Sequence, residues 1–258
     1  MNELITFNQT QSLSTVNSIK WHSSRDYLIT ADSKKCSYWN IGDGNAQCLG
    51  SLSFSSMKSL QSRNSNLDLE GNISWDPHSD NIFAAVYDTT LQIIDTREMD
   101  VTAKKTNAHD DVIRDVDFNP NKPLMLLTAG NDRKVKFWDI RNLKCSVRVL
   151  DGGHTHDICS ARYNPFHDQL VLSGGSDFLV NLWRVASCSS APWIGSEDRD
   201  ASSYEPPDVK VRTIDQHEDS VYGVAWSPAD AWIYCSLSFD GRVILNHVPS
   251  TEKYKILL

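Results

Sequence analysis

Residues 109–139 read HDDVIRDVDFNPNKPLMLLTAGNDRKVKFWD and contain three short apolar runs separated by two turns. The first run ends at the aromatic Phe118, and Pro120 follows two residues later. Because proline has no amide hydrogen and a fixed φ, it ends a strand and starts a turn. The second turn contains Asp132, and the third run ends at Trp138. Short runs with regular turns, without convincing helical periodicity, predict an all-β fold.

The same template occurs five times along the chain. The aromatic residues that end the first run are separated by 54, 43, 45 and 63 residues, and they are Trp21, Trp75, Phe118, Tyr163 and Trp226. The two shorter separations match the period of about 40–45 residues that is typical of a WD-type propeller blade. We therefore predict a WD40-repeat β-propeller, with one domain over residues 1–258. Its repeats lie at about 8–41, 66–97, 107–141, 151–185 and 214–248.

Two inserted loops explain the longer separations between repeats. They cover residues 42–68, which are rich in serine, and residues 186–213, which carry serine, proline and mostly acidic charge. Propellers have about 4–8 blades, and seven is the number we expect here. Residues 3–9, ELITFNQ, are a candidate outer strand of a preceding blade. We expect the chain to be the C-terminal part of a seven-bladed propeller; closure of five blades alone is the alternative.

Polar residues recur at fixed positions in the repeats. A histidine lies nine residues before the aromatic residue, and a serine or threonine lies four residues before the turn aspartate. The sets are His109, Thr128, Asp132 and Trp138; His154, Ser173, Asp177 and Trp183; and His217, Ser236 and Asp240, with Asn246 where tryptophan is expected. A His, Ser and Asp trio also suggests a hydrolase triad. Because a catalytic triad occurs once and this trio recurs, we interpret the sets as buried structural networks.

Composition excludes several classes of function. The 258 residues include 25 Lys and Arg against 33 Asp and Glu, which gives a net charge of −8. An acidic chain is a poor binder of nucleic acid or of anionic membranes. No apolar run approaches the ~18 residues of a membrane span, and the N-terminal residues do not resemble a secretory signal. The six cysteines form no C-x-x-C pair, so we expect no disulfide framework, metal site or cofactor.

Residues 216–248, QHEDSVYGVAWSPADAWIYCSLSFDGRVILNHV, and the preceding two repeats resemble the EARP and GARP complex-interacting protein family. The resemblance covers about 107–184 and 214–258 well and residues 1–100 more weakly. It implies a non-enzymatic adaptor for two vesicle-tethering complexes, the endosome-associated recycling complex and the Golgi-associated retrograde complex. The implied process is endosomal recycling and dense-core vesicle cargo sorting. The implied location is cytoplasmic, peripheral at the trans-Golgi network and recycling endosomes.

Propellers usually bind partners on the face where the loop before the first strand meets the second turn. We therefore expect the partner-binding residues just after each repeat histidine, at Asp111, Arg114, His156, Asp157, Asp219 and Tyr222. Protein partners are expected, without nucleic acid, membrane insertion or a small-molecule substrate.

A short motif indicates an alternative class of function, that of a ubiquitin-ligase substrate receptor. Trp138, Asp139 and Arg141 resemble the W-D-x-R signature of substrate receptors of cullin-RING ubiquitin ligases, and residues 94–97 are a partial copy. For an enzyme, by contrast, the sequence offers no glycine-rich phosphate loop after a strand and no metal-ligand spacing.

Overall fold

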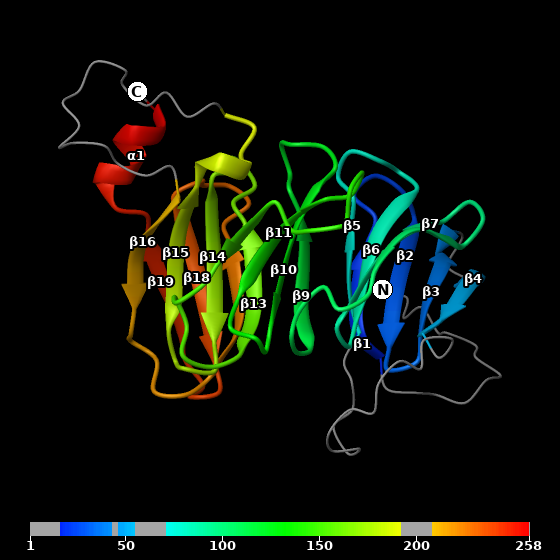
Figure 1. Ribbon diagram of the computed structural model, residues 1–258, viewed down its shortest axis with the longest axis horizontal. Helices are drawn as coiled ribbons and strands as arrows, with labels where there is room; N and C mark the ends of the chain where they lie inside the picture. The colour runs from blue at the N-terminus through cyan, green and yellow to red at the C-terminus, as the bar shows by residue number, and fades with distance from the viewer. Residues whose placement is uncertain (1–15, 43–45, 55–70, 192–207, 258) are drawn as a thin grey trace, which may run out of the picture. The chain divides into compact units, whose positions relative to one another are not determined.

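A computed structural model describes residues 16–42, 46–54, 71–191 and 208–257 of the chain. The described residues form five antiparallel sheets, which we number blades 1 to 5 in chain order (Figure 1). The chain divides into two compact units, residues 1–116 and 117–258, and the boundary falls within the first strand of blade 3.

The first unit contains blades 1 and 2, whose strands pair in sequence order. Blade 1 consists of β1 (Val16–Trp21), β2 (Tyr27–Asp32), β3 (Lys35–Asn40) and β4 (Gln47–Ser53). Blade 2 consists of β5 (Asn72–Trp75), β6 (Ile82–Tyr87), β7 (Thr90–Asp95) and β8 (Asp100–Lys105). One apolar cluster joins the two blades, with Ile29 and Tyr38 from blade 1 against Phe83 and Ile94 from blade 2.

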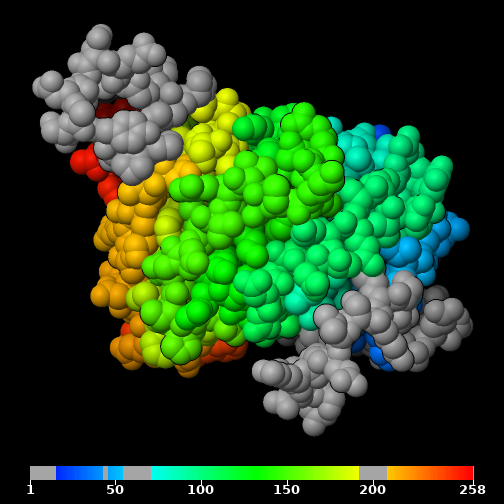
Figure 2. All heavy atoms as spheres, viewed as in Figure 1, coloured from blue at the N-terminus to red at the C-terminus, as the bar shows by residue number. Residues whose placement is uncertain are grey.

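The second unit contains the rest of the fold. Blade 3 consists of β9 (Ile113–Phe118), β10 (Met125–Gly130), β11 (Val135–Asp139) and β12 (Arg148–Leu150), and blade 4 of β13 (Ile158–Tyr163), β14 (Leu170–Gly175), β15 (Val180–Val185) and β16 (Asp208–Ile214). Blade 5 has β17 (Val221–Trp226), β18 (Ile233–Ser238) and β19 (Val243–His247). A 3-10 turn (Ala186–Cys188) follows β15, and helix α1 (Ser250–Leu257) ends the fold. The side chains of blades 3 and 4 form a continuous surface in the space-filling view (Figure 2).

The first strand of every blade ends at the predicted aromatic residue. In blades 3 and 4 the next residue is an asparagine, and its side chain stabilises the turn that contains the proline. Asn119 Oδ1 accepts hydrogen bonds from the backbone N–H groups of Asn121 and Lys122, at 2.9 and 2.7 Å. Asn164 Oδ1 likewise accepts from the backbone N–H groups of Phe166 and His167, both at 2.9 Å. These side chains replace backbone partners that the turn leaves unpaired, which explains their place after the strand.

Neighbouring blades within each unit share a repeated contact. The indole N–H of Trp75 donates to the carbonyl of Lys20, at 3.1 Å, and that of Trp226 donates to the carbonyl of Arg162, at 3.2 Å. Each acceptor directly precedes the aromatic residue of the preceding blade. The aromatic positions therefore set how blade 2 packs on blade 1 and how blade 5 packs on blade 4.

Burial differs between the middle and the ends of the chain. All residues of β14 and β15 in blade 4 are buried. In contrast, Ile19 and Trp21 of β1 and Val243 and Leu245 of β19 are exposed. Blade 5 has three strands in the described part of the chain, and β19 lies at its edge.

The structure corrects the two predicted inserted loops. Residues 47–53, within the predicted loop 42–68, form β4, and residues 208–213, within the predicted loop 186–213, belong to β16. Both are outer strands of their blades, and Ile214 is the one buried residue in the two strands, so they lack the apolar pattern that marked the inner strands. Residues 55–68 and 192–207 of those loops, and the candidate strand at 3–9, lie outside the described residues.

Helix α1 is a second element that the sequence reasoning did not predict. Its Glu252 is buried and pairs with Arg184 of β15, at 2.9 Å between Nη1 and Oε2. Ile256 packs against the apolar cluster of blades 4 and 5. Among the described helices, none is long and apolar enough to cross a membrane.

Candidate functional site

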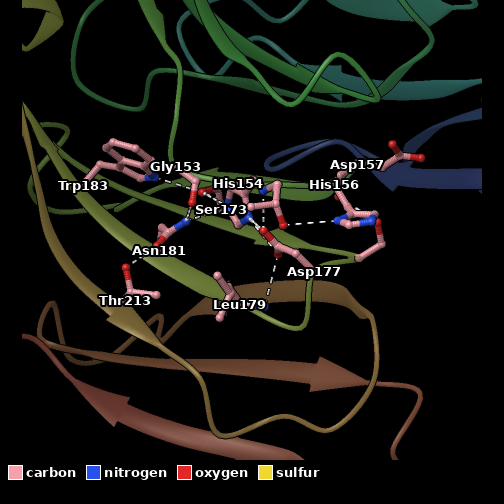
Figure 3. Close-up of polar contacts among 12 residues, drawn as sticks. Gly153, His154, His156, Asp157, Ser173, Asp177, Leu179, Asn181, Trp183 and Thr213 are labelled. Atoms are coloured by element: carbon pink, nitrogen blue, oxygen red, sulfur yellow. Dashed lines mark hydrogen bonds and ion pairs between the residues drawn. The ribbon is translucent and has the colours of Figure 1, made fainter.

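The polar network of blade 4 brings together all four residues predicted from the repeat (Figure 3). His154 Nδ1 lies 3.0 and 3.1 Å from the two carboxylate oxygens of Asp177. His154 Nε2 lies 2.8 Å from Ser173 Oγ, and the indole N–H of Trp183 donates to the same Oγ at 2.9 Å. Strands β14 and β15 therefore supply the hydroxyl and the indole, and the loop before β13 supplies the histidine.

Asn181 of β15 fixes the position of the protons in this network. Its amide nitrogen donates to the carbonyl of Gly153 at 2.8 Å and faces His154 Nε2 at 3.0 Å, while its Oδ1 accepts from Thr213. Because an amide nitrogen can only donate, His154 Nε2 accepts, and the ring proton is assigned to Nδ1. The neutral histidine then donates to Asp177 and accepts from Ser173, so each group has a partner.

Asp177 is held as a carboxylate by this arrangement. Burial on its own raises the pKa of Asp177, but the hydrogen bond and electrostatic interaction with the His154 ring and the N–H groups of Thr155 and Leu179 outweigh it and lower the pKa. The N–H of Thr155 donates at 2.8 Å and that of Leu179 at 3.2 Å. One carboxylate therefore fastens the loop before β13 to the turn between β14 and β15.

The connectivity of Ser173, His154 and Asp177 is the same as that of a serine hydrolase triad. Two observations argue against that chemistry. Ser173 is 0% exposed, and its oxygen already accepts the indole N–H of Trp183. The network also leaves no room beside the ring, because a Cβ atom at Gly175 would lie 2.7 Å from His154 Nδ1. The arrangement is suited to holding two loops together rather than to attacking a substrate.

Blade 5 repeats most of this network. His217 Nδ1 lies 3.0 Å from Asp240 Oδ2, and His217 Nε2 lies 2.8 Å from Ser236 Oγ. The N–H groups of Glu218 and Arg242 donate to the Asp240 carboxylate at 3.0 and 2.8 Å. Burial raises the pKa of Asp240, but these N–H groups and His217 outweigh it, and the pKa falls to about 2.

The tryptophan position of blade 5 is the exception. Asn246 occupies it, is buried, and its amide nitrogen has no hydrogen-bond partner within the described residues. Ser236 is therefore without the indole donor that Trp183 gives to Ser173.

Blades 3 and 1 contain the hydroxyl and indole part of the pattern. Trp138 Nε1 donates to Thr128 Oγ1 at 2.8 Å, and His109 is buried. Asp132 accepts from the N–H of Lys134 at 3.2 Å. In blade 1, Trp39 Nε1 donates to Thr30 Oγ1 at 3.0 Å. Sequence reasoning did not include Thr30 among the candidates.

Blade 2 replaces the pattern with apolar residues. Strand pairing places Ala85 and Ile94 where the other blades have the hydroxyl and the indole, and both residues are buried. Replacing both partners of a buried hydrogen bond by apolar groups is nearly neutral, whereas removing one is costly. Blade 2 therefore packs without the network, which explains why its repeat shows only the turn aspartate.

The predicted partner-binding residues lie in the loops before the first strands and at the starts of those strands. Asp111 is exposed and accepts from the N–H of Val112, whereas Arg114 is half-buried and its carbonyl accepts from Asn72. His156 is exposed beside Thr155, and Asp157 is half-buried with its carbonyl bonded to Ser176.

In blade 5 the corresponding candidates are Asp219 and Tyr222, and both are exposed. The structure places the Tyr222 ring next to Phe239, with ring centroids 4.5 Å apart. Phe239 was absent from the predicted set, because its position holds no aromatic residue in the two preceding repeats.

The candidate ligase motif forms a local ion pair. Arg141 binds Asp139 with two of its nitrogens, and this hydrogen bonding is the main reason that the pKa of Asp139 is lowered. The same pair occurs between Arg97 and Asp95 at the end of β7. Its recurrence in two blades indicates a role in the turn after the third strand. Among the described residues, no group of three or more His, Cys, Asp or Glu side chains is arranged to hold a metal ion.

Comparison with known proteins identifies the family. A family model described as EIPR1 beta-propeller matches residues 24–183. The chain belongs to the EIPR1 beta-propeller family. This finding confirms both the predicted fold class and the resemblance noted in the sequence. A second family model, described as WD domain, G-beta repeat, matches residues 2–40 and 208–245 of the chain.

Three curated relatives show how similar the chain is to other members of the family and how much of their length it covers. It is 40% identical over 250 residues to "EARP and GARP complex-interacting protein 1" of Homo sapiens, covering 86% of this chain and 64% of the relative. The identity is 38% over 191 residues to "EARP-interacting protein 1" of Caenorhabditis elegans, covering 71% and 52%. For "WD repeat-containing protein DWA2" of Arabidopsis thaliana it is 34% over 235 residues, covering 90% and 63%. The chain thus spans about half to two thirds of the length of these relatives.

Proposed function

We propose that this chain is a non-enzymatic WD-repeat adaptor that binds the EARP and GARP vesicle-tethering complexes. The observation that supports it most directly is the 40% identity over 250 residues with a human protein named for interacting with both complexes. The buried Ser173 is consistent with this proposal, because it argues against use of the recurring His, Ser and Asp sets for hydrolysis. The accompanying roles in endosomal recycling and dense-core vesicle sorting, at recycling endosomes and the trans-Golgi network, are part of the same proposal.

The loops fastened by the networks are the proposed binding surface. Asp177 ties the loop before β13 to the turn between β14 and β15, and Asp240 ties the loop before β17 to the turn after β18. Loops held in one conformation lose little conformational entropy on binding, which favours affinity. The exposed candidates His156 and Tyr222 lie in or next to these two loops, and Asp111 lies in the corresponding loop before β9.

Affinity capture of the tagged chain from its own cells tests this function. Recovery of EARP and GARP subunits, identified by mass spectrometry, is the expected result. Asp111→Ala combined with Tyr222→Ala should reduce recovery with an unchanged melting temperature. His78→Ala combined with Phe166→Ser changes exposed residues in turns between first and second strands, and should leave recovery intact. Absence of both complexes from the wild-type capture would contradict the proposal.

A ubiquitin-ligase receptor is the second candidate, because the guanidinium of Arg141 is exposed at the end of β11. The same capture experiment decides it. Recovery of a cullin adaptor that is lost in Arg141→Ala but kept in Arg97→Ala would support this candidate. Equal recovery by the two variants would exclude a specific role of the W-D-x-R motif.

A further inference from the structure

Blade 5 presents two adjacent aromatic rings to solvent. Tyr222 is the second residue of β17 and is 42% exposed, and Phe239 lies in the turn after β18 and is 70% exposed. Their ring centroids are 4.5 Å apart, with 40° between the ring planes. Exposed aromatic side chains that lie together, rather than singly, are characteristic of binding surfaces.

The backbone beneath the two rings is fixed by hydrogen bonds. The N–H of Phe239 donates to the carbonyl of Ser220 at 3.1 Å, and the hydroxyl of the buried Ser238 donates to the carbonyl of Asp219 at 2.8 Å. Asp240, the next residue, is bonded to His217 and to the N–H of Glu218. The loop before β17 and the turn after β18 therefore hold the backbone at both ring positions before any partner arrives.

The fold does not require aromatic residues at these two positions. Strand pairing aligns Val221 and Ser238 of blade 5 with Ile158 and Gly175 of blade 4. The residues that correspond to Tyr222 and Phe239 are then Cys159 and Ser176. Blade 4 forms the same hairpin with these smaller side chains. The aromatic pair is thus a local property of blade 5, and its exposure needs an explanation outside folding.

The charge around the rings is mainly negative. The loop before β17 carries Asp215, Glu218 and Asp219, all exposed, and Asp240 lies in the adjoining turn. One guanidinium opposes them, that of Arg242, which pairs with Glu218 at 2.9 Å. Aromatic faces attract cations through their quadrupole, and nearby carboxylates add to that attraction.

We propose that Tyr222 and Phe239, with Glu218 and Asp219 beside them, form a docking surface for an arginine-containing segment of a partner protein. Arginine fits better than lysine, because its planar guanidinium stacks on an aromatic ring and binds a carboxylate with two nitrogens. The natural partner rests on the proposed adaptor function, but the chemistry of the surface can be tested without it.

The test measures binding of a fluorescein-labelled Arg-Gly repeat peptide to the purified full chain by fluorescence anisotropy at low ionic strength. Saturable binding that weakens as salt is added is expected, since the carboxylates are exposed. A Glu-Gly repeat peptide should not bind. No binding of the Arg-Gly peptide, or equal binding of the two peptides, would overturn the proposal.

Variants of the aromatic pair separate its role from that of charge alone. Phe239→Ser introduces the residue that blade 4 has at this position and should weaken binding about fivefold to tenfold. Phe239→Trp keeps an aromatic face and should retain affinity. The matched control is Phe166→Ser, which removes a 45% exposed ring from a turn of blade 4 and should change nothing. Equal affinity of Phe239→Ser and wild type, with both melting normally, would overturn the proposal.

The carboxylates are tested separately, and the capture experiment tells the two proposals apart. Glu218→Gln with Asp219→Asn should also weaken peptide binding, because the substitutions keep size and remove charge; unchanged binding would count against the proposal. If the tethering complexes are not captured but the peptide binds through Phe239, only the adaptor proposal fails. If Phe239→Ser captures the complexes normally and binds the peptide as wild type does, only the docking surface fails.

Discussion

Ser173 is the residue on which the network of blade 4 depends most. Its oxygen accepts from Trp183, and its hydroxyl faces the ring of His154. Ser173→Ala removes the acceptor of the buried Trp183 indole N–H and one of the two donors to His154 Nε2, so we expect the free energy of unfolding to fall by about 1–3 kcal/mol. Urea denaturation measures this change. Ser23→Ala, at an exposed position, is the control and should stay within about 0.5 kcal/mol of wild type. Equal losses in the two variants would contradict a structural role for the network.

The carboxylate of Asp240, whose pKa lies at about 2 in the folded protein, makes the stability of the protein depend on pH in acid. The ordinary value of an aspartate, about 3.9, applies in the unfolded chain. A lowered folded pKa stabilises the protein above the unfolded pKa, and this stabilisation disappears as the pH falls through the folded pKa. The free energy of unfolding should therefore decrease between about pH 5 and about pH 2.

Asp240→Asn tests the origin of that acid sensitivity. The variant should be less stable than wild type at neutral pH, and the difference should shrink as the pH approaches about 2. Denaturant titrations across this range compare the two proteins. A difference that stays constant with pH would show that the charge of Asp240 does not contribute.

At the scale of residues, the sequence predicted four members of the blade 4 network but missed Thr30 in blade 1 and Asn181 in blade 4. Fixed spacing identified His154, Ser173, Asp177 and Trp183, because the hairpins of blades 3 and 4 have the same length. It missed Thr30, since β2 and β3 are joined by a turn one residue shorter, with Ala31 paired to Cys36. Asn181 was missed because an asparagine in a strand has no spacing signal; only the contacts show its role.

Among the elements, helix α1 is attached to blade 4 by a buried charge pair. Arg184 and Glu252 are both buried, and their side chains meet at 2.9 Å. Removing one partner of such a pair leaves an uncompensated buried charge, which costs about 3–5 kcal/mol.

Glu252→Ala should therefore destabilise the second unit strongly and release α1 from blade 4. Thermal unfolding and hydrogen exchange of residues 250–257 measure the two effects. Thr251→Ala, the neighbouring exposed position on the same helix, should leave both unchanged. A variant without the glutamate that keeps the wild-type melting temperature would show that the pair does not hold the helix.

The elements that sequence reasoning missed share a physical reason. Inner strands such as β14 are buried on both faces, so they appear as continuous apolar runs. The outer strand β4 is mostly exposed and pairs through its backbone with β3. Backbone pairing leaves little trace in composition, and the eight residues of α1 are too few for a clear helical period.

For the whole molecule, the net charge of −8 disfavours binding to polyanions. We expect no retention on immobilised heparin or single-stranded DNA at about 150 mM salt, where binding of polyanions requires many basic contacts. Retention on an anion exchanger at pH 7 is the positive control. Binding to either polyanion in that salt would show a basic surface that the composition conceals.

Among the described residues, β19 is an edge strand of blade 5, which has a consequence for handling the protein. Strand β19 ends the sheet within the described residues, with Val243 and Leu245 exposed. Such an edge offers unpaired backbone groups and apolar side chains to a second chain, so clusters should form as concentration rises. Light scattering of wild type and Leu245→Lys over a dilution series measures this, and the lysine variant should stay clear at concentrations where wild type turns turbid. A single edge strand would then limit the concentration at which the purified protein can be kept in solution.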